Sequence, residues 1–193
     1  MNRLRALLSV GWRAAVVILY FGIFALTAQS VIGLLFPGPA VPLEIAKVTH
    51  AENTAYNLKN AISSYFVEYR EYPFEIKGLD LTVPTDQTLM TILCGMDHPG
   101  VEERNPRKIH FYSGRPAKFE DGRYSQGMLL TESSEALLWD PFGNHYLVRV
   151  DTNFDNQVVD PETPESNLAE IVAVWSAGPD GDFSTWKDNI KTW

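Results

Sequence analysis

The sequence predicts an α+β fold in which a membrane-spanning helix continues, after a proline-rich kink, into an amphipathic helix packed on an antiparallel sheet. Three observations predict it. A 23-residue run without a formal charge stands near the N-terminus, a stripe of apolar residues at helical spacing follows it, and short strand-like segments separated by turn residues fill the second half.

The uncharged run from Ala14 to Phe36 is long enough to cross a membrane. At ~1.5 Å per residue, a helix of this length spans the ~30 Å hydrocarbon layer. Arg3, Arg5 and Arg13 precede the run and no comparable basic cluster follows it, so the positive-inside rule places residues 1–13 in the cytoplasm. A cleaved signal peptide would have a shorter apolar core of ~7–15 residues, so we expect a retained anchor.

Residues 37–43 contain three prolines, which should break or kink the membrane helix. From residue 44 to residue 193 we expect one exported domain, and its first element is a helix with an apolar stripe. A short coiled coil is an alternative, but the small alanines and the end of the pattern before Tyr72-Pro73 favour packing on a sheet. The stripe consists of Val48, Ala51, Ala55, Leu58, Ile62, Tyr65 and Tyr69.

The middle of the chain predicts shorter elements. A helix from Asp86 to Cys94 has an N-cap candidate in Thr85 or Asp86, and Gly95 closes it. We expect a charged loop over residues 99–106 and a chain-reversing turn over residues 140–144. Strand-like segments are predicted at residues 109–112, 118–119, 145–150 and 171–175.

The last residues of the chain combine carboxylates, hydroxyls and glycines in one loop. Ca²⁺ takes ~6–8 oxygen ligands held by a backbone that bends sharply, which Gly178 and Gly181 permit. Residues 151–193 carry nine acidic and two basic side chains, a charge that a bound cation would neutralise. An ordinary Pro-Asp-Gly turn is the alternative. The candidate calcium ligands are Ser176, Asp180, Asp182, Asp188 and Asn189.

A second acidic segment, from Asp151 to Glu162, places oxygen-bearing side chains at positions 1, 3, 5 and 12 of a calcium-loop pattern. Its sixth position is Asn156 instead of glycine, and a strand precedes it where such loops follow a helix. The favoured interpretation is therefore a hairpin turn rich in Asn and Asp, between paired strands at residues 145–150 and 157–159.

Composition argues against several function classes. The acidic balance and the absence of a basic patch outside the N-terminus argue against nucleic-acid binding. The single cysteine, Cys94, excludes an intramolecular disulfide. The four histidines form no zinc-protease motif and no Gly-x-Ser-x-Gly element occurs, so we do not expect an enzyme. Tyr65, Tyr69, Tyr72, Trp139 and Trp175 have helix and strand periodicity, which favours core packing over a ligand platform.

Four segments in order carry a family resemblance: Asn57-Leu-Lys-Asn-Ala-Ile-Ser-Ser-Tyr-Phe, Tyr69-Arg-Glu-Tyr-Pro73, Trp139-Asp-Pro-Phe-Gly-Asn144 and Trp175-Ser-Ala-Gly-Pro-Asp-Gly181, followed by a closing Asp-Asn-Ile and Trp. Together they resemble the major pseudopilin of the type II secretion system, over most of residues 44–193. The resemblance implies a pilin-like fold, a structural calcium, and assembly into a periplasmic fibre with other secretion-apparatus subunits or with further copies of this chain.

The resemblance also implies calcium ligands at Asp180 and Asp188, with Ser176 near them, and a bacterial inner-membrane anchor with a periplasmic domain. Asn189 stands where the family frequently has a second aspartate. The match does not extend to the family's leader, because Gly11 is followed by Trp12 and the first acidic residue is Glu44. A stand-alone, membrane-anchored exported binding module that uses the same fold without polymerising is therefore the alternative.

Overall fold

The computed structural model describes residues 40–75, 81–99 and 101–193. The predicted basic N-terminus at residues 1–13 and the membrane span at residues 14–36 lie outside them. No helix in the described part of the chain is long and apolar enough to cross a membrane. The chain divides into two compact units, Met1–Ile45 and Ala46–Trp193, and the second contains the sheet, the short helices and the terminal loop.

The long helix α2, Ala40–Tyr69, begins inside the predicted kink region. Pro42 is its third residue, and proline is tolerated there because the first backbone N–H groups of a helix have no intrahelical partner. The predicted apolar stripe is confirmed: Ala51, Ala55, Leu58, Ile62 and Tyr65 are fully buried, whereas Val48 and Tyr69 are half-buried.

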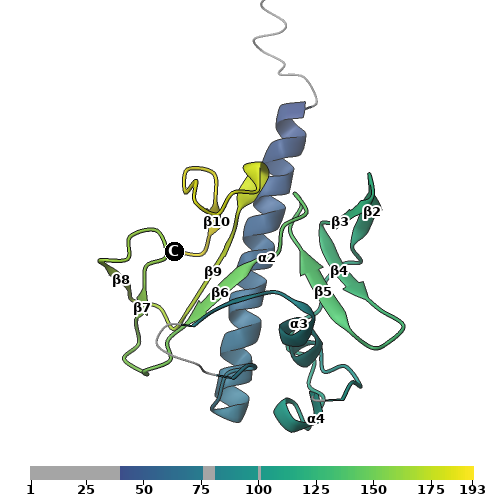
Figure 1. Ribbon diagram of the computed structural model, residues 1–193, viewed down its shortest axis with the longest axis vertical. Helices are drawn as coiled ribbons and strands as arrows, with labels where there is room; N and C mark the ends of the chain where they lie inside the picture. The colour runs from purple at the N-terminus through teal and green to yellow at the C-terminus, as the bar shows by residue number, and fades with distance from the viewer. Residues whose placement is uncertain (1–39, 76–80, 100) are drawn as a thin grey trace, which may run out of the picture. The chain divides into compact units, whose positions relative to one another are not determined.

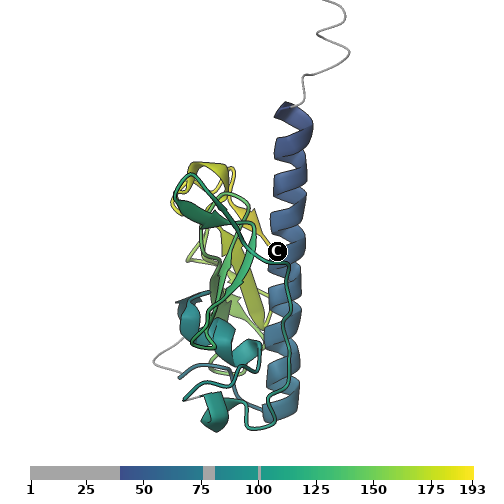
Figure 2. The same ribbon diagram turned by 90° about the vertical axis from the view of Figure 1, so that its right-hand side faces the viewer.

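A four-stranded antiparallel sheet packs against the second unit's part of this helix, as the two views in Figures 1 and 2 show. Its strand order is β1 (Thr82–Pro84), β6 (Leu147–Val150), β9 (Val172–Ser176) and β10 (Ile190–Lys191). Val148 pairs with Val174 and Val150 with Val172, and all four side chains are fully buried. The predicted arrangement of a long helix on an antiparallel sheet is thus present.

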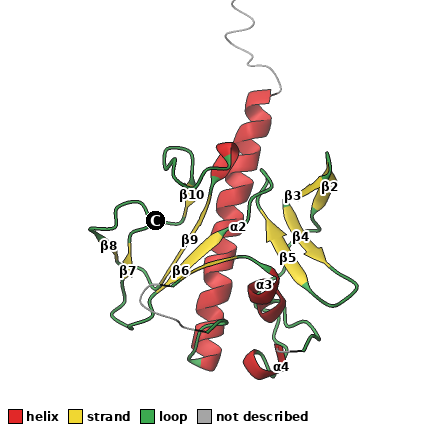
Figure 3. Cartoon of the chain, in the orientation of Figure 1, coloured by secondary structure: helices red, strands yellow, loops and turns green. Residues whose placement is uncertain are grey.

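Three two-stranded hairpins and two short helices complete the domain (Figure 3). The hairpins are β2 (Lys118–Glu120) with β3 (Arg123–Ser125), β4 (Gly127–Leu130) with β5 (Ala136–Trp139), and β7 (Val158–Val159) with β8 (Asn167–Leu168). Helix α3, Gln87–Leu93, is the predicted short helix, and the Asp86 side chain caps it by accepting from the Leu89 N–H at 3.0 Å. Helix α4, Val101–Arg104, lies where a charged loop was predicted.

The predicted strand at residues 109–112 is wrong. The backbone N–H groups of Phe111 and Tyr112 both donate to the Leu93 carbonyl at the end of α3, at 2.9 and 3.1 Å, instead of to a neighbouring strand. Asn105, which is fully buried, holds the same segment: its Nδ2 donates to the carbonyls of Ile92 and Ile109, and its Oδ1 accepts from the Ile109 N–H. Contacts across the chain therefore override a local alternating pattern.

Two further predictions need correction. Strand β6 begins at Leu147 instead of residue 145, because Tyr146 exchanges hydrogen bonds with Thr85: its N–H donates to the Thr85 hydroxyl and its carbonyl accepts from the Thr85 N–H. Strand β7 pairs with β8 and not with β6, so the acidic segment after Asp151 does not connect two adjacent strands.

Candidate metal centre in the C-terminal loop

Strand β9 ends at Ser176, where the C-terminal loop begins, and places this residue beside the buried carboxylate of Asp140. All five residues of β9 are buried, and its last residue, Ser176, is fully so. The Ser176 hydroxyl donates to Asp140 Oδ2 and accepts from the Gly178 N–H at 3.1 Å. The hydroxyl is thus already used twice, in fixing the first turn of the loop.

Asp140 is fully buried at the start of the Asp-Pro-Phe-Gly-Asn turn. Its carboxylate also accepts from the backbone N–H groups of Phe142 and Asn144, both at 2.8 Å, and from Asn144 Nδ2 at 3.2 Å. Burial raises the pKa of Asp140 above its ordinary value, while the hydrogen bonds from Ser176, Asn144 and Phe142 act in the opposite direction. With these four hydrogen bonds, the buried Asp140 carboxylate anchors its own turn and the first residue of the terminal loop.

The same turn holds the loop's first residues. Asn144 Nδ2 donates to the Gly178 carbonyl at 2.9 Å, and Gly178 has a φ of +67°. A Cβ at this position would lie 2.2 Å from the Asp188 carbonyl oxygen, so only glycine lets the beginning of the loop approach its end. The loop is therefore closed by backbone contact between Gly178 and Asp188.

Asp180 and Asp182 are exposed, and both accept hydrogen bonds from the loop itself. Asp180 accepts from the Asp182 N–H at 2.8 Å and from the Thr185 hydroxyl at 2.5 Å. Asp182 Oδ1 accepts from the Ser184 N–H and hydroxyl at 2.9 and 2.7 Å, and these bonds lower the pKa of Asp182. In the described residues no three His, Cys, Asp or Glu side chains converge as a metal-binding group.

Asn189 is the predicted ligand whose surroundings best fit a cation. It is 9% exposed, and its Nδ2 donates to the Phe183 carbonyl at 3.1 Å. Its Oδ1 is buried and has no hydrogen-bond partner among the described residues. A buried oxygen without a partner costs about 1–3 kcal/mol, and a bound cation would remove that cost. The five predicted ligands lie in one closed loop, and calcium coordination there stays a prediction.

Three tryptophans, one from β9 and two from the residues after it, form an aromatic cluster. Trp175, Trp186 and Trp193 contact one another with ring centroids 6.0–6.3 Å apart. Lys191 Nζ lies 5.6 Å from the centroid of the Trp193 ring. The prediction of core packing holds for Tyr65, Tyr72 and Trp175, which are buried, whereas Tyr69 and Trp139 are half-buried.

Sequence reasoning missed a polar cavity of about 280 Å³ beside the loop. Four parts of the chain line it: helix α2, the β2–β3 hairpin, the turn after β5 and the terminal loop. Two of these parts had been singled out from the sequence, the Asp-Pro-Phe-Gly-Asn turn and the terminal loop, but nothing in the sequence indicated that they meet at a cavity. The lining residues are Lys47, Glu120, Asp121, Arg123, Ser125, Pro141, Phe142, Asn144, Pro179, Asp180 and Gly181.

The second acidic segment uses its carboxylates within the chain. Asp151, 1% exposed, accepts from the N–H groups of Phe154 and Asn156 at 2.6 and 2.7 Å. Asp155 accepts from the Gln157 N–H and from Asn153 Nδ2, both at 2.9 Å. These contacts are those of a turn built by Asp and Asn side chains, as predicted, but the turn is not a hairpin because β7 pairs with β8 instead of β6.

Comparisons of the chain with models of protein families, with curated proteins and with solved structures find no match. The long helix packed on an antiparallel sheet is consistent with a pilin-like fold.

Proposed function

We propose that the chain is a pseudopilin-like structural subunit of a type II secretion apparatus, or of a related pilus-like apparatus. In this proposal residues 14–36 anchor it in the bacterial inner membrane with the N-terminus in the cytoplasm. The domain from residue 44 to residue 193 lies in the periplasm, contacts other subunits of the apparatus or further copies of the chain, and catalyses no reaction. The terminal loop carries a structural calcium ion.

The two faces of α2 are the observation that carries this proposal. One face packs against the domain's own core through side chains such as Leu58 and Ile62. The opposite face is open to solvent and includes large apolar side chains: Tyr56 is 48% exposed and Val67 is 64% exposed. A helix that already has a sheet on one side can pack against a neighbouring subunit only with the other side.

Crosslinking of the full-length chain in its own membrane tests the assembly. A chain with Tyr56→Cys and Val67→Cys should give a ladder of linked oligomers with a bifunctional maleimide, because both positions lie on the open face. The matched control carries Phe119→Cys and Phe154→Cys, which are 61% and 58% exposed but lie off α2. Cys94 is 2% exposed and burial raises its pKa to about 12, so it does not compete.

A ladder that is equally strong in both chains, or absent from the α2 chain, would contradict assembly through this helix face. In the second case the alternative gains: a stand-alone exported binding module anchored in the membrane. The polar cavity of about 280 Å³ favours that alternative, since it brings the charged side chains of Lys47, Arg123 and Asp180 to one concave site.

Calcium is tested separately, by thermal unfolding of the full-length chain in detergent with EGTA or with millimolar Ca²⁺. Exported calcium modules bind at ~10⁻⁴–10⁻³ M, and an ion at ten times its dissociation constant stabilises by about 1.4 kcal/mol. Ca²⁺ should therefore raise the melting temperature, and this increase should disappear in a chain with Asp180→Ala and Asp188→Ala. It should persist in a matched chain with Asp155→Ala and Asp160→Ala, which loses equal charge from the second acidic segment.

A further inference from the structure

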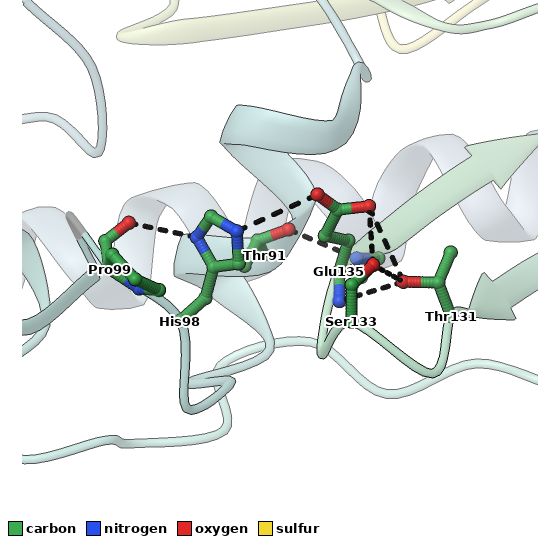
Figure 4. A network of polar contacts seen from close by, with 7 residues as sticks. Thr91, His98, Pro99, Thr131, Ser133 and Glu135 are labelled. Carbon is green, nitrogen blue, oxygen red and sulfur yellow. Dashed lines mark hydrogen bonds and ion pairs between the residues drawn. The ribbon is translucent and has the colours of Figure 1, made fainter.

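The contacts of His98 define a site that is independent of the terminal loop. Figure 4 shows His98 between the Pro99 carbonyl and the Glu135 carboxylate, with two hydroxyls behind that carboxylate. His98 follows α3 and Glu135 precedes β5, so the pair joins two elements 37 residues apart in sequence. The side chains are 30% and 24% exposed, which leaves the space between them open to solvent ions.

The Pro99 carbonyl determines which ring nitrogen of His98 carries the proton. His98 Nδ1 lies 2.8 Å from that carbonyl oxygen, which only accepts hydrogen bonds, so Nδ1 must be the donor. In the neutral imidazole, Nε2 is then an unprotonated acceptor. Metal-binding histidines are usually oriented in this way, with one N–H on a backbone carbonyl and the other nitrogen free to bind.

The Glu135 carboxylate is held in a matching way. Its Oε2 accepts from the Ser133 hydroxyl at 2.9 Å and from the Thr131 hydroxyl at 3.4 Å. Its Oε1 faces His98 Nε2. Thr131 is fixed in turn, because its hydroxyl accepts from the Glu135 backbone N–H at 3.1 Å. Hydrogen bonds of this kind orient carboxylates that bind metals.

The distance between the two free atoms favours an ion between them. His98 Nε2 and Glu135 Oε1 are 3.6 Å apart, which is too long for a hydrogen bond between a charged donor and acceptor. Two ligands at about 2.0–2.2 Å from a tetrahedral Zn²⁺ are separated by about 3.4 Å. Because both side chains are partly exposed, water can reach the space between them and complete the coordination.

We propose that His98 and Glu135 form a binding site for a divalent transition-metal ion, with Zn²⁺ as the expected occupant and water in the remaining positions. Imidazole nitrogen with carboxylate oxygen is a donor set that suits Zn²⁺, whereas Ca²⁺ prefers oxygen alone. With two protein ligands the site binds weakly and exchanges rapidly. The bound ion ties the segment after α3 to the β4–β5 hairpin.

Zinc titration of the full-length chain in detergent at pH 7.5 tests this, with the ¹⁵N shifts of the His98 ring and thermal unfolding as two readouts. Before zinc is added, the ring should be the tautomer with Nδ1 protonated. Added Zn²⁺ should shift the Nε2 resonance progressively and saturate as a single site below millimolar Zn²⁺, with a parallel rise in melting temperature. Binding should weaken at least tenfold in His98→Gln and Glu135→Gln chains, and remain in a His110→Gln chain, whose histidine is exposed.

Circular dichroism in EDTA checks that each variant is folded, so that lost binding reflects a lost ligand. The zinc response should also persist in the chain with Asp180→Ala and Asp188→Ala, which separates this site from the proposed calcium loop. The proposal is overturned if millimolar Zn²⁺ leaves the His98 ring unchanged, or if the Glu135→Gln chain binds zinc as tightly as the unaltered chain. An ion pair with a protonated His98 would then explain the contact.

Discussion

Replacing Gly178 by alanine tests whether backbone contact closes the terminal loop. An alanine Cβ would lie 2.2 Å from the Asp188 carbonyl oxygen, where ordinary contact begins at 3.4 Å, so the two strands of the loop must separate by about 1 Å. That shift would break the bonds that Gly178 makes to Ser176 and Asn144, each worth about 1 kcal/mol. The positive φ adds about 1–2 kcal/mol for any residue with a Cβ.

The expected cost is therefore about 3–4 kcal/mol in the free energy of unfolding, measured by urea denaturation of the full-length chain. Gly122→Ala is the matched control, because Gly122 has a φ of +78° but an alanine Cβ there would meet no atom of the described residues within 4 Å. It should cost only about 1–2 kcal/mol. If the two substitutions cost the same within about 0.5 kcal/mol, the close contact with Asp188 does not contribute to stability.

Three further predictions concern buried polar groups. Asp140→Ala leaves four donors without their acceptor and should lower the free energy of unfolding by about 3–5 kcal/mol. The control Asp86→Ala, which removes an exposed helix cap, should lower it by about 1 kcal/mol. Equal losses in urea denaturation would contradict the role of Asp140 as an anchor. Burial raises the pKa of Asp140, so the folded chain binds the proton of this carboxyl group more tightly than the unfolded chain does. The stability gained from this proton should be lost as pH rises from about 3.8 through the raised pKa. Asp140→Ala should therefore flatten the curve of the free energy of unfolding against pH. Asn105→Ala should cost at least about 3 kcal/mol and Asn60→Ala, on the exposed face of α2, less than about 1 kcal/mol; a small loss at residue 105 would mean that water replaces its hydrogen bonds.

Sequence reasoning succeeded where structure depends on neighbours along the chain. The stripe on α2 follows from residues three and four apart, and the cap of α3 follows from Asp86 and the N–H of Leu89 three residues later. Strand β9 was predictable because a run of β-branched and aromatic residues ends at a loop rich in glycine. In each case the determining contacts lie within one or two helical turns or strand lengths.

Sequence reasoning failed where distant residues compete for the same backbone. Residues 109–112 alternate like a strand, but the Leu93 carbonyl and the Asn105 side chain take their hydrogen bonds. The candidate site shows the same limit. Its carboxylates and glycines were visible in the last 18 residues, whereas Asp140, which anchors Ser176, lies 36 residues earlier. No local pattern reports a contact of that sequence separation.

Asn189 offers the sharpest distinction between a metal loop and an ordinary turn. Asn189→Asp keeps the shape of the side chain but replaces the Nδ2 that donates to the Phe183 carbonyl with an oxygen that repels it. In EGTA the variant should therefore unfold more easily than the unaltered chain. A calcium ion at this point would instead gain a charged ligand, and calcium affinity increases with ligand charge. The difference in melting temperature between millimolar Ca²⁺ and EGTA should thus be larger for the variant. If the difference is unchanged or smaller, the unpaired Oδ1 of Asn189 does not face a cation, and the acidic loop is held by its own hydrogen bonds alone.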